Sequence, residues 1–332
     1  MPVRRARPAQ LPRPRPWALP DSAATPPALC MERRRLLRAG AGLAAAAAAG
    51  RLAACTSDRS TDLDPAAEWP VAAPRESRFS LSDPVTPRAE VAGWTNYLEF
   101  GAEKRLAAEA SVLDVTAWTV RIDGLVERPL TLDLNELLAR LPIEERVYRH
   151  RCIEGWAFVA PWTGVPLAAL VELARPLGSA KYLRMESFYD PLTAHGQFRF
   201  WHDWPYTEAL TLAEATHELA FLATGAYGQP LAKQNGAPLR AGIPWKYGSK
   251  SIKAIRRFTF VEDRPPTFWP TSRPDLYGFW ANVGPEVDHP FGPQEYEYRL
   301  GEDDVRRTER YNGYEEWVGE LYRGLEAERL FV

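Results

Sequence analysis

The sequence predicts a mixed α+β fold that is rich in β-strands. Segments that alternate apolar and polar side chains recur along the chain, as they do in half-buried strands. The helical patterns between these segments are short, and the chain contains 30 proline and 12 tryptophan residues. Because proline interrupts regular structure, this composition favours a loop-rich domain with aromatic-lined pockets over a helical bundle.

The first three expected elements lie between residues 118 and 151. Residues 118–124 alternate and end in Asp-Gly, which predicts a strand entering a turn. Residues 131–138 predict the start of a short helix, with Asp133 as its N-cap and a proline after its end. Residues 146–151 alternate apolar and basic side chains and predict a second strand.

The remaining elements follow the same logic. Residues 161–166 predict a loop, and Pro166 begins a helix that runs through Ala174. Further strands are expected at 181–189 and 252–261, and residues 211–223 combine a strand with a short helix. The chain is expected to end in a helix over 315–328, because Trp317, Val318, Leu321 and Leu325 recur at helical spacing.

Charge is divided unevenly between the beginning of the chain and the rest. Residues 1–54 contain ten arginines and two acids, although the whole chain has a net charge of only −2. The remainder has 31 basic and 41 acidic side chains, a net charge of about −10. An acidic body of this kind argues against nucleic acid as a partner.

The basic leader, residues 1–54, has the pattern of an export signal. Arg33, Arg34 and Arg35 precede a short alanine-rich run, which falls well below the ~20 apolar residues of a membrane-spanning helix. Paired arginines predict recognition by the twin-arginine translocase and a periplasmic location. The start is at either Met1 or Met31.

Residues 52–55 add a second possibility at the end of the leader. The order Leu-Ala-Ala-Cys resembles a lipobox, so that Cys55 is either a lipid-anchored N-terminus or a position near ordinary signal cleavage. Residues 55–110 then form a proline-rich extended arm, and residues 111–332 form the catalytic domain. Within the arm, residues 93–101 either close over a ligand or pack the arm against the body.

Cys152 follows the strand 146–151 and is the candidate centre of the chemistry. Arg146, Arg149 and Arg151 precede it, and nearby positive charge lowers a thiol pKa, so a thiolate is expected. The exported body has no other cysteine, which leaves this thiol without a disulfide partner. A thiolate in this position is either a nucleophile or a ligand for a soft metal.

A second candidate stretch, residues 234–253, predicts an anion site. Four cations lie within fourteen residues of this stretch, among glycines that let backbone amides approach a phosphate: Arg240, Lys246, Lys250 and Lys253. The chain contains no Walker loop, no Gly-x-Ser-x-Gly elbow and no Gly-x-Gly-x-x-Gly fingerprint. The five histidines also lack a zinc-binding spacing.

The stretches 144–156 and 234–253 together resemble the molybdopterin proteins of the sulfite oxidase superfamily. Within that superfamily the sequence is most similar to the periplasmic protein-methionine-sulfoxide reductases, from the leader to the C-terminal Tyr-Arg-Gly-Leu. The resemblance implies a sulfite-oxidase-type domain with one molybdenum and one molybdopterin, and with Cys152 as the metal ligand. It implies that Cys152, Asn96 and Glu154 carry the catalysis.

The resemblance also implies a set of cofactor contacts. Ser187 stands where the family usually has threonine, and Thr95 and Leu98 depart from the family pattern in the arm. The implied cofactor-binding residues are Thr95, Asn96, Leu98, Glu99, Cys152, Ser187, Asn235, Arg240, Ser251, Ile252 and Lys253. Arg240 and Lys253 are expected at the phosphate end.

The activity that the resemblance implies is reduction of methionine sulfoxide in oxidised periplasmic proteins. The implied electron donor is a haem-containing integral membrane subunit. Two other interpretations are open: a sulfite-oxidising molybdoenzyme on the same fold, and a metal-free binding protein in which Cys152 is a redox thiol.

Overall fold

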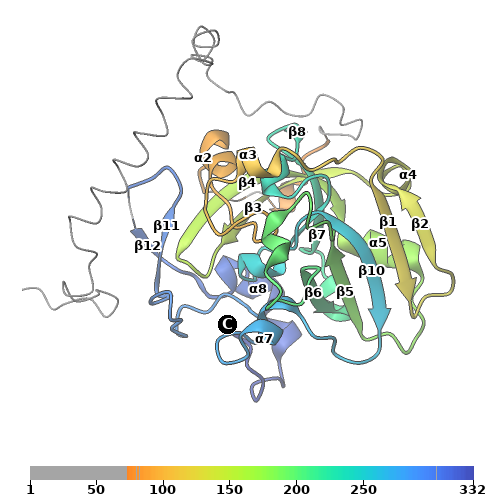
Figure 1. The fold of residues 1–332 in the computed structure, drawn as a ribbon. Coiled ribbons are helices and arrows are strands. Elements are labelled where there is room, and N and C mark those ends of the chain that lie inside the picture. The colour runs from red at the N-terminus through yellow and green to blue at the C-terminus, as the bar shows by residue number, and fades with distance from the viewer. Residues whose placement is uncertain (1–72, 80, 82, 304) are drawn as a thin grey trace, which may run out of the picture. The chain divides into compact units, whose positions relative to one another are not determined.

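Two β-sheets form the framework of the molecule (Figure 1). The structure, a computed structural model, describes residues 73–79, 81, 83–303 and 305–332. The leader with its arginine triplet, and residues 55–72 of the arm with Cys55, lie outside the described residues. In Figure 1, strands β1 and β2 lie on the right-hand side, and β11 and β12 lie on the left.

The five-stranded sheet has the order β2-β1-β10-β5-β6. Its strands are β1 (Thr119–Gly124), β2 (Leu130–Asp133), β5 (Tyr182–Ser187), β6 (Thr207–Thr211) and β10 (Ile255–Val261). β1 and β10 are parallel, and the other neighbours are antiparallel. Alternate side chains such as Val120 and Ile122 are fully buried, as the sequence pattern predicts.

The seven-stranded sheet has the path β12-β11-β4-β7-β8, with β3 paired to β4 and β9 paired to β7. Its strands are β3 (Glu144–Arg151), β4 (Trp156–Pro166), β7 (Phe221–Ala226), β8 (Gln229–Pro230), β9 (Arg240–Gly242), β11 (Tyr296–Arg299) and β12 (Val305–Arg307). The central strand β4 is buried along nearly its whole length. The β3–β4 hairpin brings Cys152 to its turn.

The helices are all short and lie around the sheets. The α-helices are α2 (Arg88–Gly93), α3 (Ala107–Ala110), α4 (Leu134–Leu138), α5 (Leu167–Ala174), α6 (Leu212–Ala215), α7 (Phe268–Ser272) and α8 (Glu315–Val318). The 3-10 turns are η2 (Ser77–Phe79), η3 (His195–Phe198), η4 (Lys233–Asn235), η5 (Gly248–Lys250), η6 (Arg310–Gly313) and η7 (Gly319–Tyr322). The side chain of Asp133 caps α4 by accepting from the backbone amide of Asn135, as predicted. In the part of the chain that the structure describes, we find no helix with the length and apolar character to span a bilayer.

The prediction of a loop over residues 161–166 is wrong, because these residues complete strand β4. β4 pairs with β11 at Trp156 and Ala157, and with β7 from Trp162 onwards. Pro161 lies between these two pairings, where, among the described residues, β3 is the only strand in register with β4. Strands accept proline where a neighbouring strand is missing, so the sequence signal for a loop marks a change of partner instead.

The prediction of a long C-terminal helix over residues 315–328 is also wrong. Only one α-helical turn, α8, forms there, and the 3-10 turn η7 follows it directly. Gly324 has a positive φ of 82°, which ends the helical path. The burial of Val318 and Tyr322 in the core holds the segment in place without a regular helix.

Asp83 joins the arm to the seven-stranded sheet. Its carboxylate accepts hydrogen bonds from Arg149 at 2.6 Å, from Arg299 at 2.8 Å and from Arg306 at 3.3 Å. Burial opposes ionisation of this carboxyl group, but the bonds from the arginines outweigh it and hold the Asp83 pKa below its ordinary value. Arg299 is itself almost fully buried, so it depends on this partner.

Replacing Asp83 by asparagine is expected to lower the free energy of unfolding by about 3 kcal/mol at neutral pH, because it leaves the buried Arg299 with only the more distant carboxylate of Glu302, at 3.6 Å. Since the folded-state pKa is depressed, the stabilisation is complete above the ordinary value of 3.8 and is lost as the pH falls through the folded value. Urea unfolding at pH 7 and pH 3 measures both effects. Asp275→Asn, in an exposed ion pair, is the control, and equal losses in the two variants would contradict the role of Asp83.

Candidate active site

A cavity of about 270 Å³ lies where the arm meets the turns after β3 and around η5. All the residues predicted for the site except Ser187 line it. The predicted residues in its wall are Thr95, Asn96, Leu98, Glu99, Cys152, Glu154, Asn235, Arg240, Ser251, Ile252 and Lys253. The structure therefore brings together arm residues and domain residues that lie more than a hundred positions apart in the sequence.

Cys152 occupies the first position of the tight turn between β3 and β4. The amide of Gly155 donates to the Cys152 carbonyl at 3.0 Å, and Gly155 adopts a positive φ of 95° that suits glycine. The Cys152 Sγ lies 3.3 Å from the Asn96 side-chain nitrogen and 3.4 Å from the Glu154 amide. Both nitrogens donate toward the sulfur, so the turn and the arm together orient the thiol.

The prediction that three arginines lower the pKa of Cys152 is wrong. Burial first, and the carboxylate of Glu154 second, raise the pKa of the thiol to about 12. Each arginine forms an ion pair with a carboxylate: Arg146 with Glu144, Arg149 with Asp83 and Arg151 with Glu297. Arg151 also donates to the Cys152 carbonyl and lowers the thiol pKa, but burial and Glu154 outweigh this effect. The thiol is therefore a poor free nucleophile, whereas a bound metal ion would deprotonate it outright.

Lys104 is a site residue that the sequence reasoning missed. Its ammonium group lies 2.8 and 2.7 Å from the two carboxylate oxygens of Glu154, and it also donates to the side-chain oxygen of Asn96. Trp156 Nε1 donates to Glu154 at 2.9 Å. Burial alone would raise the pKa of Glu154, but these bonds outweigh it and lower that pKa. The one available signal was that Lys104 is the only cation between residues 93 and 104.

Replacing Lys104 by methionine is expected to lower kcat about 10–100-fold, because partners that orient groups around a metal typically have effects of this size. The side chains of Asn96 and Glu154 would lose their common donor, so kcat should change more than KM. Arg105→Met, an exposed neighbour, is the control, and Lys104→Arg should recover part of the loss. Equal activity of Lys104→Met and the control would show that this lysine does not position the site.

Only two of the four cations predicted for the anion site face the cavity. Lys246 and Lys250 are almost fully buried and form ion pairs with Glu214 at 2.6 Å and Glu208 at 2.7 Å. The prediction is corrected for these two lysines, because buried carboxylates already neutralise them. Their role is to fix the segment around η5, which forms one wall of the cavity.

Arg240 is a buried cation that faces the cavity. Its guanidinium group donates to the backbone carbonyls of Asn235 at 2.8 Å and of Ser251 at 3.4 Å, and it lies 5.0 Å from the ring centroid of Trp162. Among the described residues it forms no ion pair with a carboxylate, and burial lowers its pKa to about 10. Burying an uncompensated charge is costly, so this position calls for an anion.

Lys253 adds a second cation at the same wall. It is half-buried beside Arg240, Glu99 and the arm, and its ammonium group donates to the Asn96 carbonyl at 2.8 Å. Burial, with Arg240 as the next cause, lowers its pKa. Glu99 is buried, and burial raises its pKa to about 7. An anionic group between Arg240 and Lys253 would relieve both cations, which fits the phosphate of a molybdopterin.

The side chains of Ser187, Asn235 and Ser251 form hydrogen bonds with backbone atoms in and behind the cavity wall. Ser187 lies behind the cavity, where its hydroxyl donates to the Lys253 carbonyl at 2.9 Å. The Asn235 side chain donates to the Val91 carbonyl at 3.0 Å, and the Ser251 hydroxyl accepts from the Ile243 amide at 3.2 Å. Thr95, Leu98 and Ile252 also line the cavity. The structure thus gives Ser187 a supporting place behind the cavity wall.

Several ring side chains complete the wall and were not predicted individually. They are Trp94, Tyr97, His150, Trp156, Phe158, Tyr206, Trp269, Tyr277 and Phe291. The high tryptophan content predicted aromatic-lined pockets but could not say which rings take part. The rings give one side of the cavity an apolar surface, which suits a flat ring system or a thioether-like group.

Replacing Arg240 by glutamine is expected to lower cofactor occupancy about tenfold or more, because a charge-assisted hydrogen bond contributes roughly 1.5–3 kcal/mol. Glutamine keeps donors for the backbone carbonyls and removes the charge. Pterin released from the purified protein, measured by fluorescence, reports occupancy. Arg256→Gln, an arginine outside the cavity, is the control. Full occupancy in Arg240→Gln would show that Arg240 does not bind the anionic group.

Fold and site define a molybdopterin-binding oxidoreductase. The family model described as "Oxidoreductase molybdopterin binding domain" matches residues 107–269, a range that contains both sheets' central strands and Cys152. This match agrees with the cavity, which is lined by one soft sulfur donor, Cys152, and by the cations Arg240 and Lys253. It confirms the α+β molybdopterin fold that the sequence predicted.

The chain belongs to the family of protein-methionine-sulfoxide reductase catalytic subunits, MsrP, and is therefore an enzyme of that class. It is 43% identical to the MsrP catalytic subunit of Ralstonia nicotianae over 323 residues, which cover 94% of this chain and 96% of that protein. It is 41% identical to the Burkholderia mallei protein over 322 residues, with coverage of 94% and 96%. Among solved structures, the sulfane dehydrogenase SoxCD from Paracoccus pantotrophus aligns with a TM-score of 0.38 and 21% identity, over 46% of this chain and 40% of that chain.

Proposed function

We propose that the protein is a molybdenum-dependent reductase that repairs methionine sulfoxide in exported proteins. The observation that carries the proposal is the shared cavity of Cys152, Arg240 and Lys253, in a chain of the MsrP family. Thiolate sulfur suits a soft metal, and the two cations suit a phosphate. The reaction converts methionine sulfoxide, two electrons and two protons into methionine and water.

When bound, the cofactor supplies a redox centre that accepts the sulfoxide oxygen and takes up electrons. The chain's own groups orient the substrate beside Cys152. Asn96 Nδ2, which points toward the Cys152 sulfur, can donate to the sulfoxide oxygen, and Lys104 holds the Asn96 oxygen so that the nitrogen faces inward. Glu154 and Lys104 together can pass protons to the departing oxygen, since their charged groups are in direct contact.

The charges near the thiol favour a neutral substrate over sulfite. The Glu154 carboxylate is the charge that acts most strongly on the Cys152 thiol, and Lys104 is already paired with that carboxylate. Arg151, the other nearby cation, is paired with Glu297. Arg240 and Lys253 are committed to the cofactor in this proposal. A sulfite anion would therefore meet no free cation beside the thiol, whereas a sulfoxide needs only a hydrogen-bond donor.

Assays on the full chain, purified from a host that makes molybdopterin, test the proposal. We expect the protein to contain molybdenum and to oxidise a reduced viologen dye when methionine sulfoxide is added. Sulfite-dependent reduction of cytochrome c without sulfoxide reduction would support the sulfite-oxidising alternative instead. Activity without molybdenum would support the redox-thiol alternative.

Periplasmic delivery through the twin-arginine translocase is part of the proposal and rests on Arg33, Arg34 and Arg35. Changing these arginines to lysine should leave the protein, loaded with cofactor, in the cytoplasm, and unchanged export would contradict this route. Labelling with radioactive palmitate separates a lipid anchor at Cys55 from ordinary cleavage.

A haem-containing membrane subunit is the proposed electron donor, since the relatives are named catalytic subunits. When the protein and methionine sulfoxide are added together to reduced membranes of the producing cell, the membrane haem should be reoxidised. The change in haem absorbance measures this. Reoxidation by methionine sulfoxide alone would mean that this protein is not the acceptor.

A further inference from the structure

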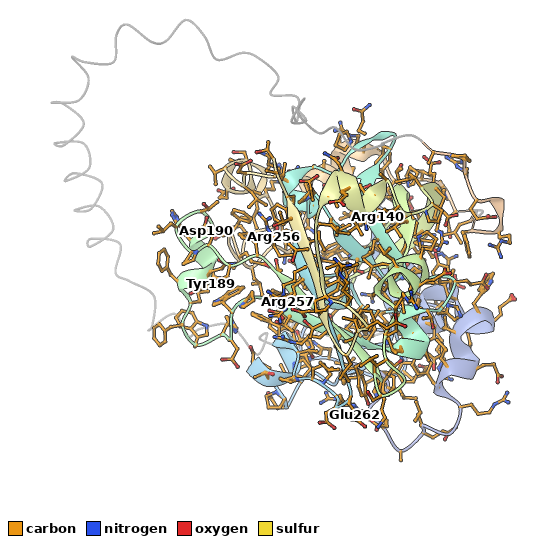
Figure 2. The ribbon with its side chains drawn as sticks, turned by 90° about the vertical axis from the view of Figure 1, so that its right-hand side faces the viewer. Arg140, Tyr189, Asp190, Arg256, Arg257 and Glu262 are labelled. Atoms are coloured by element: carbon orange, nitrogen blue, oxygen red, sulfur yellow. The ribbon has the colours of Figure 1, made fainter. Side chains whose placement is uncertain are left out.

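Five large apolar side chains are exposed within one loop, residues 189–201, which we name the aromatic loop. Tyr189, Leu192, Phe198, Phe200 and Trp201 are 60%, 81%, 58%, 89% and 64% exposed. Such a density of exposed rings on one segment is unusual for a soluble surface and generally marks a binding site. Figure 2 shows Tyr189 and Asp190 at the left edge of the body, on a loop that projects from it.

The aromatic loop is attached to the cavity wall on both sides. The amide of Gly196 donates to the Glu99 carbonyl at 2.8 Å, and a side chain at Gly196 would clash with the Leu98 carbonyl. After the loop, the His202 ring pairs with the Ser272 hydroxyl at 3.0 Å and packs against Phe268. Leu98, Glu99 and Trp269, next to Phe268, all line the cavity. The exposed rings therefore lie at the rim of the cavity.

The charge of this rim favours an apolar polypeptide over a membrane. Arg199 is the only lysine or arginine between residues 189 and 203, and Asp190 and Asp203 lie on either side of it. Anionic lipid surfaces attract clusters of cations, which this segment lacks. A bilayer on the loop would also cover the region next to the cavity, where a protein substrate must enter.

We propose that the aromatic loop docks a flexible apolar segment of the oxidised protein, next to the methionine sulfoxide that enters the cavity. The inference rests on the proposed function and adds a second contact region to it. Methionine is itself apolar, and many of its neighbours in protein interiors are too, so unfolded clients present apolar segments beside the oxidised residue. Tyrosine, tryptophan and phenylalanine are the side chains that most often anchor such contacts.

The test compares two substrates for the double variant Phe200→Ser/Trp201→Ser. For an unfolded, oxidised protein such as oxidised casein, KM should rise about tenfold, since two anchor rings are removed. For free methionine sulfoxide, kcat and KM should stay at the wild-type values. Trp317→Ser, an exposed aromatic on α8, is the matched control and should change neither.

Fluorescence anisotropy of labelled oxidised casein measures docking independently of turnover. Weaker binding by the double variant supports the proposal, and unchanged binding and KM for casein overturn it. If the double variant binds casein like the wild type but no longer cosediments with lipid vesicles, the proposal is also overturned. The aromatic loop would then be a membrane-binding site. If the wild-type protein reduces neither substrate, the proposed function fails, while the anisotropy comparison still decides the role of the loop.

Discussion

Replacing Cys152 by serine is expected to reduce methionine sulfoxide reduction to background while leaving the fold intact. Serine is nearly the same size, so it can occupy the turn between β3 and β4 without new strain. An alkoxide or hydroxyl is a harder ligand than thiolate and does not reproduce its electronic contribution to a soft metal. Turnover with a reduced viologen dye, together with the thermal unfolding curve, measures both parts of the expectation.

Cys30→Ser is the matched control, because it removes a thiol from the leader only. The control should retain full activity. If Cys152→Ser also retains full activity, the thiol is not a ligand and the proposed chemistry fails. If Cys152→Ser is inactive because it does not fold, Cys152→Ala gives a second test of whether the thiol or the packing matters.

Lys246→Met is expected to produce a large loss of stability, because Lys246 holds the segment behind the cavity wall in place. The Lys246 ammonium group bonds to Glu214 at 2.6 Å and to the Trp280 carbonyl and Asn282 side chain, both at 2.8 Å. Removing one partner of a buried pair costs about 3–5 kcal/mol, because the other charge is left unpaired. Since η5 follows Lys246 directly, cofactor retention should fall as well.

The urea-unfolding midpoint measures this loss. Lys181→Met, in an exposed pair with Glu262, should change the free energy of unfolding by only about 0–1 kcal/mol. Adding Glu214→Gln to Lys246→Met should recover part of the stability, because it removes the unpaired charge. A Lys246→Met variant as stable as wild type would mean that the pair does not hold this wall.

The sequence predicted the part of the site that depends on local motifs. Cys152 in its turn and the cations Arg240 and Lys253 were identified from short stretches, and all three line the cavity. Lys104 could not be identified this way, because its importance comes from contacts with Asn96 and Glu154 across the fold. Long-range contacts of this kind leave little pattern in the local sequence.

The errors in the sequence-based expectations have one cause. The local sequence pattern does not show which groups surround a side chain in the folded protein. Charge counting around Cys152 predicted a low pKa, but the arginines are paired elsewhere and burial dominates. Pro161 was interpreted as a loop signal, although it lies in a strand with a missing neighbour. Strands with clear alternation, such as β1 and β10, were predicted well because their pattern reflects burial directly.

The most direct test of the central claim is the molybdenum X-ray absorption spectrum of the purified, loaded protein. The claim is that the Cys152 thiolate binds the metal of a molybdopterin held in this cavity. We expect Cys152→Ser to lose one sulfur neighbour of the metal, while the sulfurs of the pterin remain. Identical sulfur shells in the wild-type protein and in Cys152→Ser would contradict ligation by Cys152 and, with it, the proposed site.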